Sequence, residues 1–511
     1  MKLFYNGCFH TMQKPGEVFA ALLVDQKGSI IETFAKVPLG YGEERIDLQG
    51  SQIFPGFIDT HTHSFEGGLY TYAADLGSCR DLKEIFEKLS ETEAIDNTII
   101  AFNFDENLIS EKRFPNRREL DRLFPSKSCL IRRTDGHSVQ INSRLIKELA
   151  SDIRKQGNIL KTNLNELNRK EEGAFRGDLN DFICHWFHQN LTEEWILRAY
   201  QKGAERAVKT GHTTIHTMIG DAKKNPLHYS FLQEMIKKEQ FPVDFILYPQ
   251  ILDVQKALEL NAGRIGGCIL ADGSFGSGTA ALTEAYLNDP ENKGFLYKTD
   301  EEWETFIFEA HNNNLQIGVH CIGDAAIRQI LTHYVRAQRQ NPKDLRHQII
   351  HSELITNDEI IGLMSEYGVA AVMQPVFDQL WGGAKGFYST LLGSERALQC
   401  NRLHSLVQAG VLVTGSSDWY VTALDALQGV QAAVNLHNPV ERLTPYQAME
   451  LYTKNAAVLS GDEKRIGTLS QGKEADFVCL AGNPLEEKNI SCIPVLEVFK
   501  RGKAVYRRDE F

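Results

Sequence analysis

The sequence lacks the features of a membrane or secreted protein. No apolar run approaches the roughly 20 residues that a membrane-spanning helix needs. The N-terminus reaches Gly7 and polar residues too soon to contain the apolar core of a signal peptide. We therefore expect a cytoplasmic protein that does not bind membranes.

Paired cysteines are also missing. The nine cysteines include no Cys-x-x-Cys pair, and their odd number leaves at least one thiol unpaired. This pattern argues against a disulfide framework or a cysteine-rich zinc site. It favours a reducing compartment.

Positive charge is in deficit. Lys and Arg number 55 against 67 Asp and Glu, which gives a formal net charge of −12. This balance argues against a phosphate-binding surface, so we expect a small-molecule substrate and no nucleic acid partner. The 511 residues are 42% hydrophobic, a composition typical of a globular chain with a large core. A homodimer is compatible with a chain of this size.

Two β-rich ends flank a long middle in which strand-like and helix-like stretches alternate. Residues 1–54 and 464–511 hold short apolar runs and glycine turns, which predicts that both ends form one small β-sandwich domain. Residues 55–463 contain ten runs that fit the strands of βα units. If residues 64–191 are an insertion near the mouth, after the first strand, eight strands remain. The predicted fold class is therefore α/β, a (β/α)8 TIM-type barrel with this insertion.

The strongest local signal is a His-x-His pair at the end of an apolar run. His61 and His63 follow Phe57 and Ile58 in this run. Side chains at i and i+2 of a strand face the same side, so two imidazoles would enter one space. Imidazole nitrogen suits zinc, iron, nickel and related metals. Two histidines in a polar turn are the alternative.

Three further apolar runs end in residues of metal-ligand type, which are His320, His351 and Asp418. Buried histidine and aspartate side chains need partners. A helix N-cap explains Asp418 alone, and a hydrogen-bonded core histidine explains either of the others alone. Four such strand ends in barrel order instead predict one metal site at the carboxyl ends of the strands.

This set resembles the metal-dependent amidohydrolase superfamily, whose pattern is His-x-His on strand 1, His on strands 5 and 6 and Asp on strand 8. Its YtcJ-like branch, which includes N-substituted formamide deformylase and the proteins called exoenzyme regulatory proteins, is resembled in residues 133–137, 272–277, 443–448 and 466–477. The resemblance covers nearly the whole chain. It implies an amidohydrolase that cleaves a non-peptide C–N bond of amide, formamide or carbamate type in a small molecule.

The resemblance also implies roles for the ligand-type residues. His61, His63 and Asp418 would bind a divalent metal, with zinc expected first and manganese, iron or nickel as alternatives. His320 and His351 would bind a second metal, or His320 would join the first and His351 would polarise the substrate. The metal would supply hydroxide at neutral pH, and Asp418 would act as general base and then as general acid towards the leaving amine.

Cys268 departs from the pattern of the branch. The branch usually carries at this place a lysine that can be carbamylated to bridge two metals. The thiolate of Cys268 would itself bind or bridge a metal, since a soft thiolate suits zinc. Alternatively the site is mononuclear and Cys268 is a small packed residue. Both interpretations stay open at the level of sequence.

Five residues are candidates for contact with the substrate. Asp135 and His137 stand at alternate positions of a predicted strand end, in a segment that lies over the barrel mouth in the family; a surface turn is the alternative. Asp272 and Ser274 follow the fourth barrel strand and would line the pocket. Trp419 follows the eighth strand and would shape the pocket or simply pack.

Two other functions remain open. A mononuclear site would favour a deaminase that releases ammonia from an amidine-type carbon. A non-catalytic scaffold is least favoured, because all five ligand positions of the family pattern are filled by His61, His63, His320, His351 and Asp418.

Overall fold

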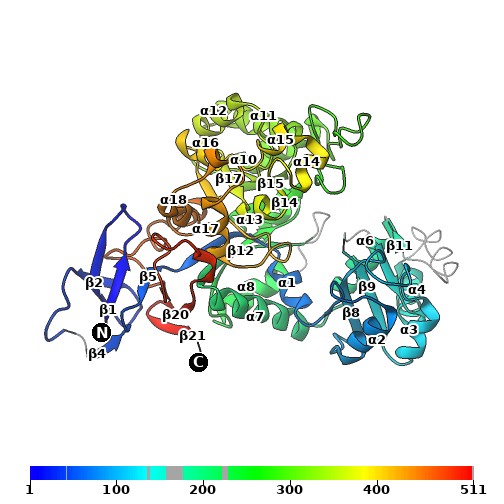
Figure 1. Ribbon diagram of the computed structural model, residues 1–511, viewed down its shortest axis with the longest axis horizontal. Helices are drawn as coiled ribbons and strands as arrows, with labels where there is room; N and C mark the ends of the chain where they lie inside the picture. The colour runs from blue at the N-terminus through cyan, green and yellow to red at the C-terminus, as the bar shows by residue number, and fades with distance from the viewer. Residues whose placement is uncertain (42, 135–137, 157–174, 177, 221–227, 509–511) are drawn as a thin grey trace. The chain divides into compact units, whose positions relative to one another are not determined.

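The computed structural model describes residues 1–41, 43–134, 138–156, 175–176, 178–220 and 228–508. The chain divides into two compact units (Figure 1). One comprises Met1–Ser64 together with Ala204–Phe511, and the other comprises Phe65–Gly203. Among the described residues, no helix has both the length and the apolar character that crossing a bilayer requires.

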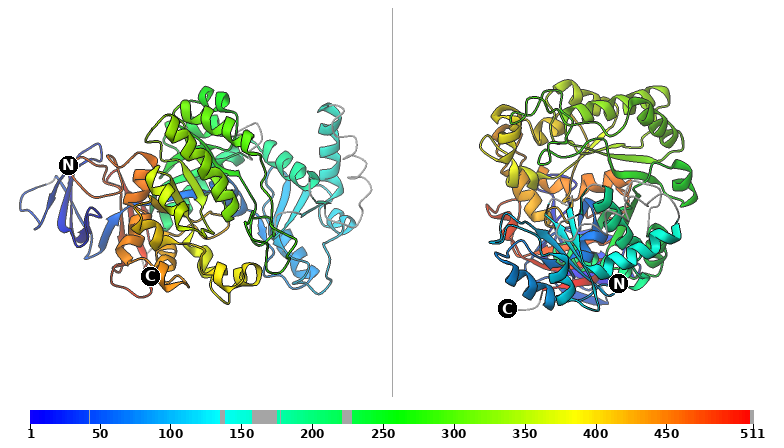
Figure 2. Two further views of the ribbon diagram at one scale, coloured as in Figure 1. Left: turned by 90° about the horizontal axis from the view of Figure 1, so that it is seen from above. Right: turned by 90° about the vertical axis from the view of Figure 1, so that its right-hand side faces the viewer.

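Both chain ends of the first unit contribute to one eight-stranded sheet (Figure 2). They meet where β19 (Phe477–Leu480) pairs antiparallel with β5 (Gln52–Pro55). Aromatic side chains from both ends fill its core, with the Phe4 and Phe477 ring centroids 5.1 Å apart. A second layer that would make this sheet a sandwich stays a prediction. The other strands are β1 (Lys2–His10), β2 (Val18–Val24), β3 (Ile30–Phe34), β4 (Glu44–Asp47), β20 (Val495–Lys500) and β21 (Lys503–Arg507).

The same unit contains two parallel sheets built from the predicted apolar runs. Most residues of their strands are buried, as expected for parallel strands covered on both faces. The predicted α/β class is thereby confirmed. One sheet consists of β6 (Phe57–Thr62), β12 (His212–Ile219) and β13 (Asp244–Pro249), and the other of β14 (Arg264–Leu270), β15 (Gln316–Cys321), β16 (Gln348–His351), β17 (Ala370–Met373) and β18 (Val413–Gly415).

Main-chain hydrogen bonds join β6 to the segment that follows β18. Asp418 N donates to His61 O at 3.0 Å, and His63 N donates to Trp419 O at 2.6 Å. Strands β13 and β14 are also neighbours, and Gln250 Nε2 donates to Cys268 O at 3.3 Å. The carboxyl ends of strands from both sheets therefore lie together.

Helices follow the parallel strands, and several of them begin at a residue whose side chain caps the first turn. The first turn of α10 (Asp300–Asn312) is closed by reciprocal hydrogen bonds between Thr299 and Glu302, which satisfy main-chain amides that a helix start leaves unpaired. Helices α10 and α11, drawn in green, cover strands of the larger parallel sheet (Figure 2). The other helices are α8 (Tyr229–Lys237), α9 (Val254–Glu259), α11 (Asp324–Gln340), α12 (Asp358–Glu366), α13 (Pro375–Trp381), α14 (Phe387–Leu392), α15 (Ser394–Ala397), α16 (Leu403–Gln408), α17 (Ala426–Val434), α18 (Pro445–Leu451), α19 (Lys454–Ser460), η2 (Pro439–Glu441) and η3 (Ile490–Cys492).

The second unit has its own sheet and its own core. The sheet order is β11–β10–β9–β8–β7, and helices α2 and α3 pack their buried leucines and isoleucines against it. The insertion was predicted to span residues 64–191, and this unit spans Phe65–Gly203. Its elements are α1 (Ser64–Tyr70), β7 (Ala74–Asp75), α2 (Leu82–Glu91), β8 (Thr98–Phe104), α3 (Arg117–Leu123), β9 (Ser128–Arg133), β10 (Ser138–Ile141), α4 (Ser143–Gln156), β11 (Phe175–Arg176) and α6 (Asp178–Gln189), while α7 (Glu193–Lys209) begins in this unit and ends in the first.

Candidate metal centre

The His-x-His pair at the end of β6 converges on a single carboxylate oxygen. His61 Nε2 and His63 Nε2 each lie 3.2 Å from Asp418 Oδ1. The His61 side chain is fully buried, and that of Asp418 is nearly so. Burial alone would raise the pKa of Asp418, but the two imidazoles beside its carboxylate lower it well below its usual range. The carboxylate therefore stays ionised in an enclosed site.

His320 and His351 enter the same space from β15 and β16. Their ring centroids are 4.5 Å apart, and those of His61 and His351 are 5.5 Å apart. Left-handed backbone occurs at His351, with φ of 71°, and at Asp418, with φ of 52°. Such strain is uncommon for residues other than glycine and concentrates at functional sites. It falls here on two of the predicted ligands.

Hydrogen bonds fix which ring nitrogen of each histidine is available. His351 Nδ1 donates to Gln374 Oε1 at 2.7 Å, and Gln374 Nε2 donates in turn to Ser416 Oγ at 2.8 Å. His320 Nε2 donates to Gly273 O at 3.0 Å. In the neutral rings these bonds leave Nε2 of His351 and Nδ1 of His320 with lone pairs. Burial and neighbouring His320 lower the pKa of His351, which favours its neutral form.

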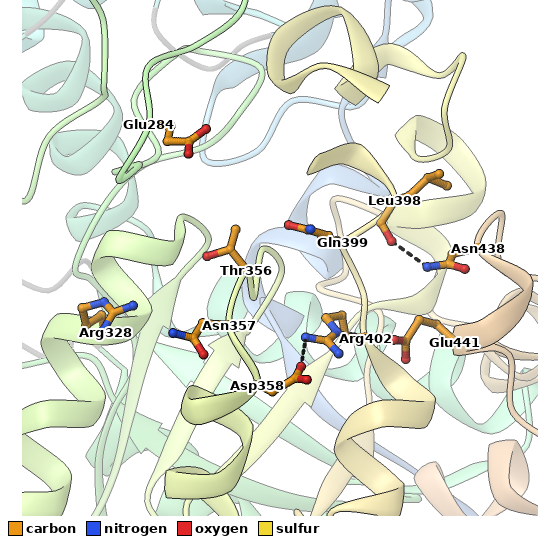
Figure 3. A pocket seen from close by; sticks show the side chains of 10 residues that line it. All are labelled: Glu284, Arg328, Thr356, Asn357, Asp358, Leu398, Gln399, Arg402, Asn438 and Glu441. Atoms are coloured by element: carbon orange, nitrogen blue, oxygen red, sulfur yellow. Dashed lines mark hydrogen bonds and ion pairs between the residues drawn. The ribbon is translucent and has the colours of Figure 1, made fainter. Parts of the chain in front are cut away.

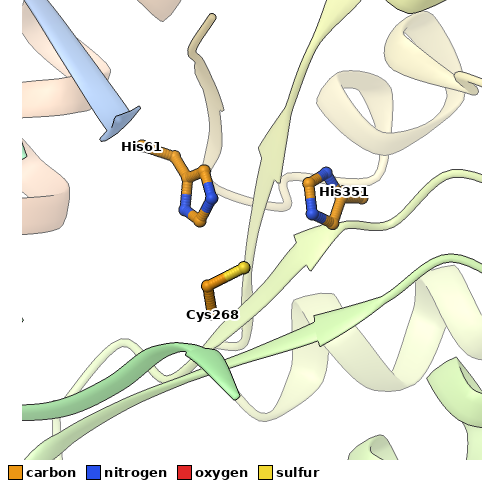
Figure 4. A group of neighbouring side chains, drawn as sticks. All are labelled: His61, Cys268 and His351. Carbon is orange, nitrogen blue, oxygen red and sulfur yellow. The ribbon is translucent and has the colours of Figure 1, made fainter. Parts of the chain in front are cut away.

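Cys268 lies among these imidazoles. Its Sγ, a nitrogen of His61 and a nitrogen of His351 all lie within 4.8 Å of one another (Figure 4). The same limit holds for the ligand atoms of His61, His63 and Asp418. We call the six residues the imidazole cluster: His61, His63, Cys268, His320, His351 and Asp418.

The imidazole cluster fits a soft divalent metal. Both ring nitrogens of His61 and Oδ1 of Asp418 are buried, and among the described residues they have no hydrogen-bond partner of good geometry. Unsatisfied buried polar atoms are costly unless an ion or water completes them. Imidazole, carboxylate and thiolate are together the donors that zinc prefers.

A third group has the same spacing but different chemistry. Asp244, Glu474 and Asp476 bring carboxylate oxygens within 4.8 Å of one another. Lys500 Nζ lies 2.5 Å from Asp476 and 2.8 Å from Asp244, and further ion pairs come from two arginines. Side-chain cations thus neutralise these acids. We call the group the ion-paired cluster: Asp244, Glu474, Asp476, Arg465, Lys500 and Arg501.

The residues predicted to contact substrate lie in varied settings. Asp135 and His137 fall outside the described residues. Asp272 is fully buried, and its carboxylate accepts hydrogen bonds from three main-chain amides, those of Ala281, Ile322 and Gly323. Its evident use is to hold the loop after β14 against the loop after β15. A substrate contact for Asp272 stays a prediction.

Ser274 and Trp419 differ in their relation to the cluster. Ser274 is exposed and its Oγ lies 2.9 Å from Ser277 Oγ. Trp419 is 9% exposed, and its main-chain carbonyl accepts the hydrogen bond from His63 N. Trp419 therefore helps to hold β6 beside the segment after β18. Their contact with substrate also stays a prediction.

Asp59 and Gln374 contact members of the site although sequence reasoning did not select them, and Glu353 lies buried two residues after His351. Asp59 accepts hydrogen bonds from His61 N and Ser417 N, both at 3.0 Å, and burial raises its pKa to about 7. Burial likewise raises the pKa of Glu353 to about 7. Gln374 orients His351. The sequence did contain an indication for Asp59 and Glu353, because each is an acidic residue two positions from a predicted ligand. It contained no indication for Gln374.

A separate cavity of about 690 Å³ lies among loops and helices of the first unit (Figure 3). Its wall includes Arg402, which pairs with Asp358 at 2.6 Å and with Glu441 at 3.4 Å. No member of the imidazole cluster lines it. We therefore assign this cavity no part in the chemistry of the cluster.

A family model and two curated relatives match nearly the whole chain. The model of the amidohydrolase family matches residues 44–506. The putative amidohydrolase YtcJ of Bacillus subtilis is 26% identical over 546 aligned positions, which cover 99% of this chain and all of that protein. N-substituted formamide deformylase of Arthrobacter pascens is 21% identical, over 91% of this chain and 90% of that protein.

The fold has a solved counterpart. An uncharacterized metal-dependent hydrolase from Pyrococcus furiosus superposes with a TM-score of 0.80 at 23% identity, over 95% of this chain and all of that one. The match over nearly the whole length excludes a resemblance limited to the metal-binding segments. The chain therefore belongs to the amidohydrolase family, in its YtcJ-like branch, and is a hydrolase that acts on carbon–nitrogen bonds.

Proposed function

We propose that the chain is a metal-dependent hydrolase of a small amide, formamide or carbamate, cleaving a C–N bond other than a peptide bond. The observation that carries the proposal is the convergence of His61 Nε2 and His63 Nε2 on one buried oxygen of Asp418. The formamide substrate named for the Arthrobacter pascens relative supports the substrate class.

His61, His63 and Asp418 would hold one divalent ion, and His320 and His351 would hold a second or support the first. We propose zinc, with manganese, iron or nickel as alternatives, because imidazole and carboxylate accept all of these. When bound, such an ion supplies Lewis acidity that polarises a carbonyl and lowers the pKa of water to about 7.

Asp418 is proposed as the proton carrier. Its carboxylate is ionised, because its pKa is held well below the usual range, and in this form it would take the proton of the attacking water. It then returns that proton to the amine that leaves. His351 is the second catalytic residue. It serves as a ligand, or its neutral ring polarises the carbonyl, and its hydrogen bond to Gln374 keeps it oriented in either role.

We infer that β6 and β12 to β18 close into a (β/α)8 barrel. The parallel bridge between Thr62 and Trp419 supports closure on one side, and the adjacency of β13 and β14 supports it on the other. Residues 64–191 would be its insertion, and residues 1–54 and 464–511 a composite β-sandwich. No disulfide joins two of the described cysteines, which supports a cytoplasmic location.

The test is a substrate panel assayed with untagged protein purified without chelators and loaded with zinc. N-substituted formamides, simple amides, carbamates and amidines are incubated with wild-type protein, with His61→Ala and with His404→Ala. His404 lies on α16 and serves as the matched histidine control. We expect release of amine and carboxylate from at least one compound, lost in His61→Ala and kept in His404→Ala.

Two results would overturn the proposal. Release of ammonia from an amidine, without cleavage of any amide, formamide or carbamate, would make the chain a deaminase. Equal turnover by His61→Ala and the wild type would remove the metal assignment.

A further inference from the structure

Strand β14 is interrupted by a bulge at the residues that precede and include Cys268. Gly266 pairs with Gly318 of β15, and the next pair joins Ile269 to Val319, so Gly267 and Cys268 have no partner in the β14–β15 register. A bulge of this kind redirects a side chain that regular pairing would place elsewhere.

Both glycines are needed for this bulge. Gly266 has φ of +85° and Gly267 has φ of +90°, values that other residues rarely adopt. A Cβ on Gly266 would lie 2.3 Å from Gly318 O, and one on Gly267 would lie 2.2 Å from Met218 Sδ. In the sequence Gly266-Gly267-Cys268, regular strand pairing is therefore interrupted, and two residues without side chains precede the thiol that enters the cluster.

The Cys268 sulfur lies between two pairs of imidazoles. It is within 4.8 Å of a nitrogen of His61 and of a nitrogen of His351, and the ring centroids of His351 and His320 are 4.5 Å apart. One atom therefore faces both the His61–His63 pair and the His320–His351 pair. That is the place a ligand shared by two ions would occupy.

A second observation points to a ligand at the same place. His61 is fully buried, and neither of its ring nitrogens has a well-formed hydrogen bond among the described residues. Its ligand atom belongs both to the group with Cys268 and His351 and to the group with His63 and Asp418. The cysteine is thus part of a donor set that the chain leaves incomplete.

We propose that Cys268 is a metal ligand whose thiolate bridges two divalent ions, one on the side of His61, His63 and Asp418 and one on the side of His320 and His351. This inference rests on the proposed function, because it needs a metal in the cluster. A thiolate bridge selects soft or borderline ions such as zinc or cobalt over magnesium or manganese.

Packing alone does not account for this cysteine. The adjacent strand offers a comparison in Cys321, which follows His320 but is fully buried, with its Sγ 3.7 Å from Val319 O. Burial raises the pKa of the Cys321 thiol well above its usual range. Cys321 is therefore an inert thiol next to the same histidine, and it serves as the matched control.

The test is a cobalt(II) titration of the metal-free, full-length protein followed by absorption spectroscopy. Bound cobalt gives weak visible bands with any ligand set, whereas a thiolate ligand adds an intense near-ultraviolet charge-transfer band. We expect that band in wild-type protein and in Cys321→Ser, with two equivalents of cobalt bound. In Cys268→Ser and Cys268→Ala we expect the band to be lost and the second equivalent to bind at least tenfold more weakly.

The outcomes separate this inference from the proposed function. Visible cobalt bands without a charge-transfer band in wild-type protein would overturn thiolate ligation and leave the metal-dependent hydrolase intact. A charge-transfer band with a single equivalent bound would overturn the bridge. Absence of any cobalt binding to wild-type protein would overturn both. Each of these contradicting outcomes is measured on wild-type protein. The inference can therefore be overturned even if the Cys268 variants do not fold.

Discussion

The imidazole cluster and the ion-paired cluster both bring ionisable side chains together at distances suited to a metal ion. In the ion-paired cluster, Lys500 and two arginines supply the positive charge that the acids require. In the imidazole cluster, the groups that keep Asp418 ionised are themselves potential ligands, His61 and His63. Distance alone therefore does not distinguish a metal site. The source of the compensating charge does.

The two clusters also lie at different places on the strands. Asp244 is the first residue of β13, whereas His61, His320 and His351 lie at the carboxyl ends of their strands. In parallel α/β folds the carboxyl ends carry the reactive groups. We accordingly assign stability to the ion-paired cluster and chemistry to the imidazole cluster, and substitutions in each can break this division.

The largest effect is expected for Asp418→Asn. The amide keeps the shape of the side chain but cannot accept the proton of the attacking water, so kcat/KM on a confirmed substrate should fall by about a thousandfold or more. Steady-state kinetics measures the loss, and circular dichroism checks the fold. Turnover within a few-fold of wild type would show that Asp418 is not the proton carrier.

Lys500→Met should act on stability and not on metal binding. Lys500 is 7% exposed, so its removal leaves buried Asp476 without a counter-ion, at a cost of about 3–5 kcal/mol in the free energy of unfolding. Denaturant unfolding measures it. Lys256→Met removes an exposed pair with Glu259 and should cost under about 1 kcal/mol. Loss of bound metal in Lys500→Met without unfolding would contradict the division.

Gln374→Leu should weaken metal binding without removing a ligand. Its amide oxygen orients His351, and loss of such a partner typically lowers metal affinity or activity about 10- to 100-fold. A competition titration with a chromophoric chelator measures the affinity. Gln399→Leu, at the separate cavity, is the matched control and should bind metal like wild type. Equal affinity in both variants would remove the orienting role of Gln374.

The smallest effect is the acid dependence of the ion-paired cluster. Burial alone would raise the pKa of Asp244, but Lys500, Arg501 and Arg465 lower it to about 2 from an ordinary value of 3.8. A lowered folded pKa means that the stabilisation is present above pH 3.8 and is lost as the pH falls towards 2.

Asp244→Asn should therefore flatten the pH dependence of the unfolding free energy between these values, by about 2 kcal/mol in total. Unfolding followed across this pH range measures it. Asp344→Asn, which alters an exposed pair with Arg346, is the control and should leave the slope unchanged. An identical slope in wild type and Asp244→Asn would exclude Asp244 as the titrating group.

The sequence allowed the α/β class and the convergence of the candidate ligand residues to be predicted, for a physical reason. Apolar runs of parallel strands are easy to recognise, and polar ligand types such as His320 and His351 stand out at their ends. Because carboxyl ends of parallel strands meet at one edge, residues far apart in the chain could be expected together. The structure places His61, His63, His320, His351 and Asp418 in that arrangement.

The remainder depended on register and on tertiary contacts. The bulge that directs Cys268 into the cluster is set by backbone conformation at Gly266 and Gly267, which no periodicity reveals. Gln374, which follows β17, orients His351 at the end of β16 through one hydrogen bond, and the sequence does not indicate that contact. Asp272 was predicted to line the pocket because it is polar and follows a strand. In the structure its carboxylate accepts hydrogen bonds from three main-chain amides.

The most direct test of the division between the clusters is elemental analysis of metal content per chain. Untagged wild-type protein, His63→Ala and Lys500→Met are purified without chelators and incubated with zinc before removal of unbound metal. We expect two equivalents in wild type and Lys500→Met, and fewer in His63→Ala. Absence of metal from the wild type after incubation with zinc or manganese, or full metal content in His63→Ala, would contradict a metal centre in the imidazole cluster.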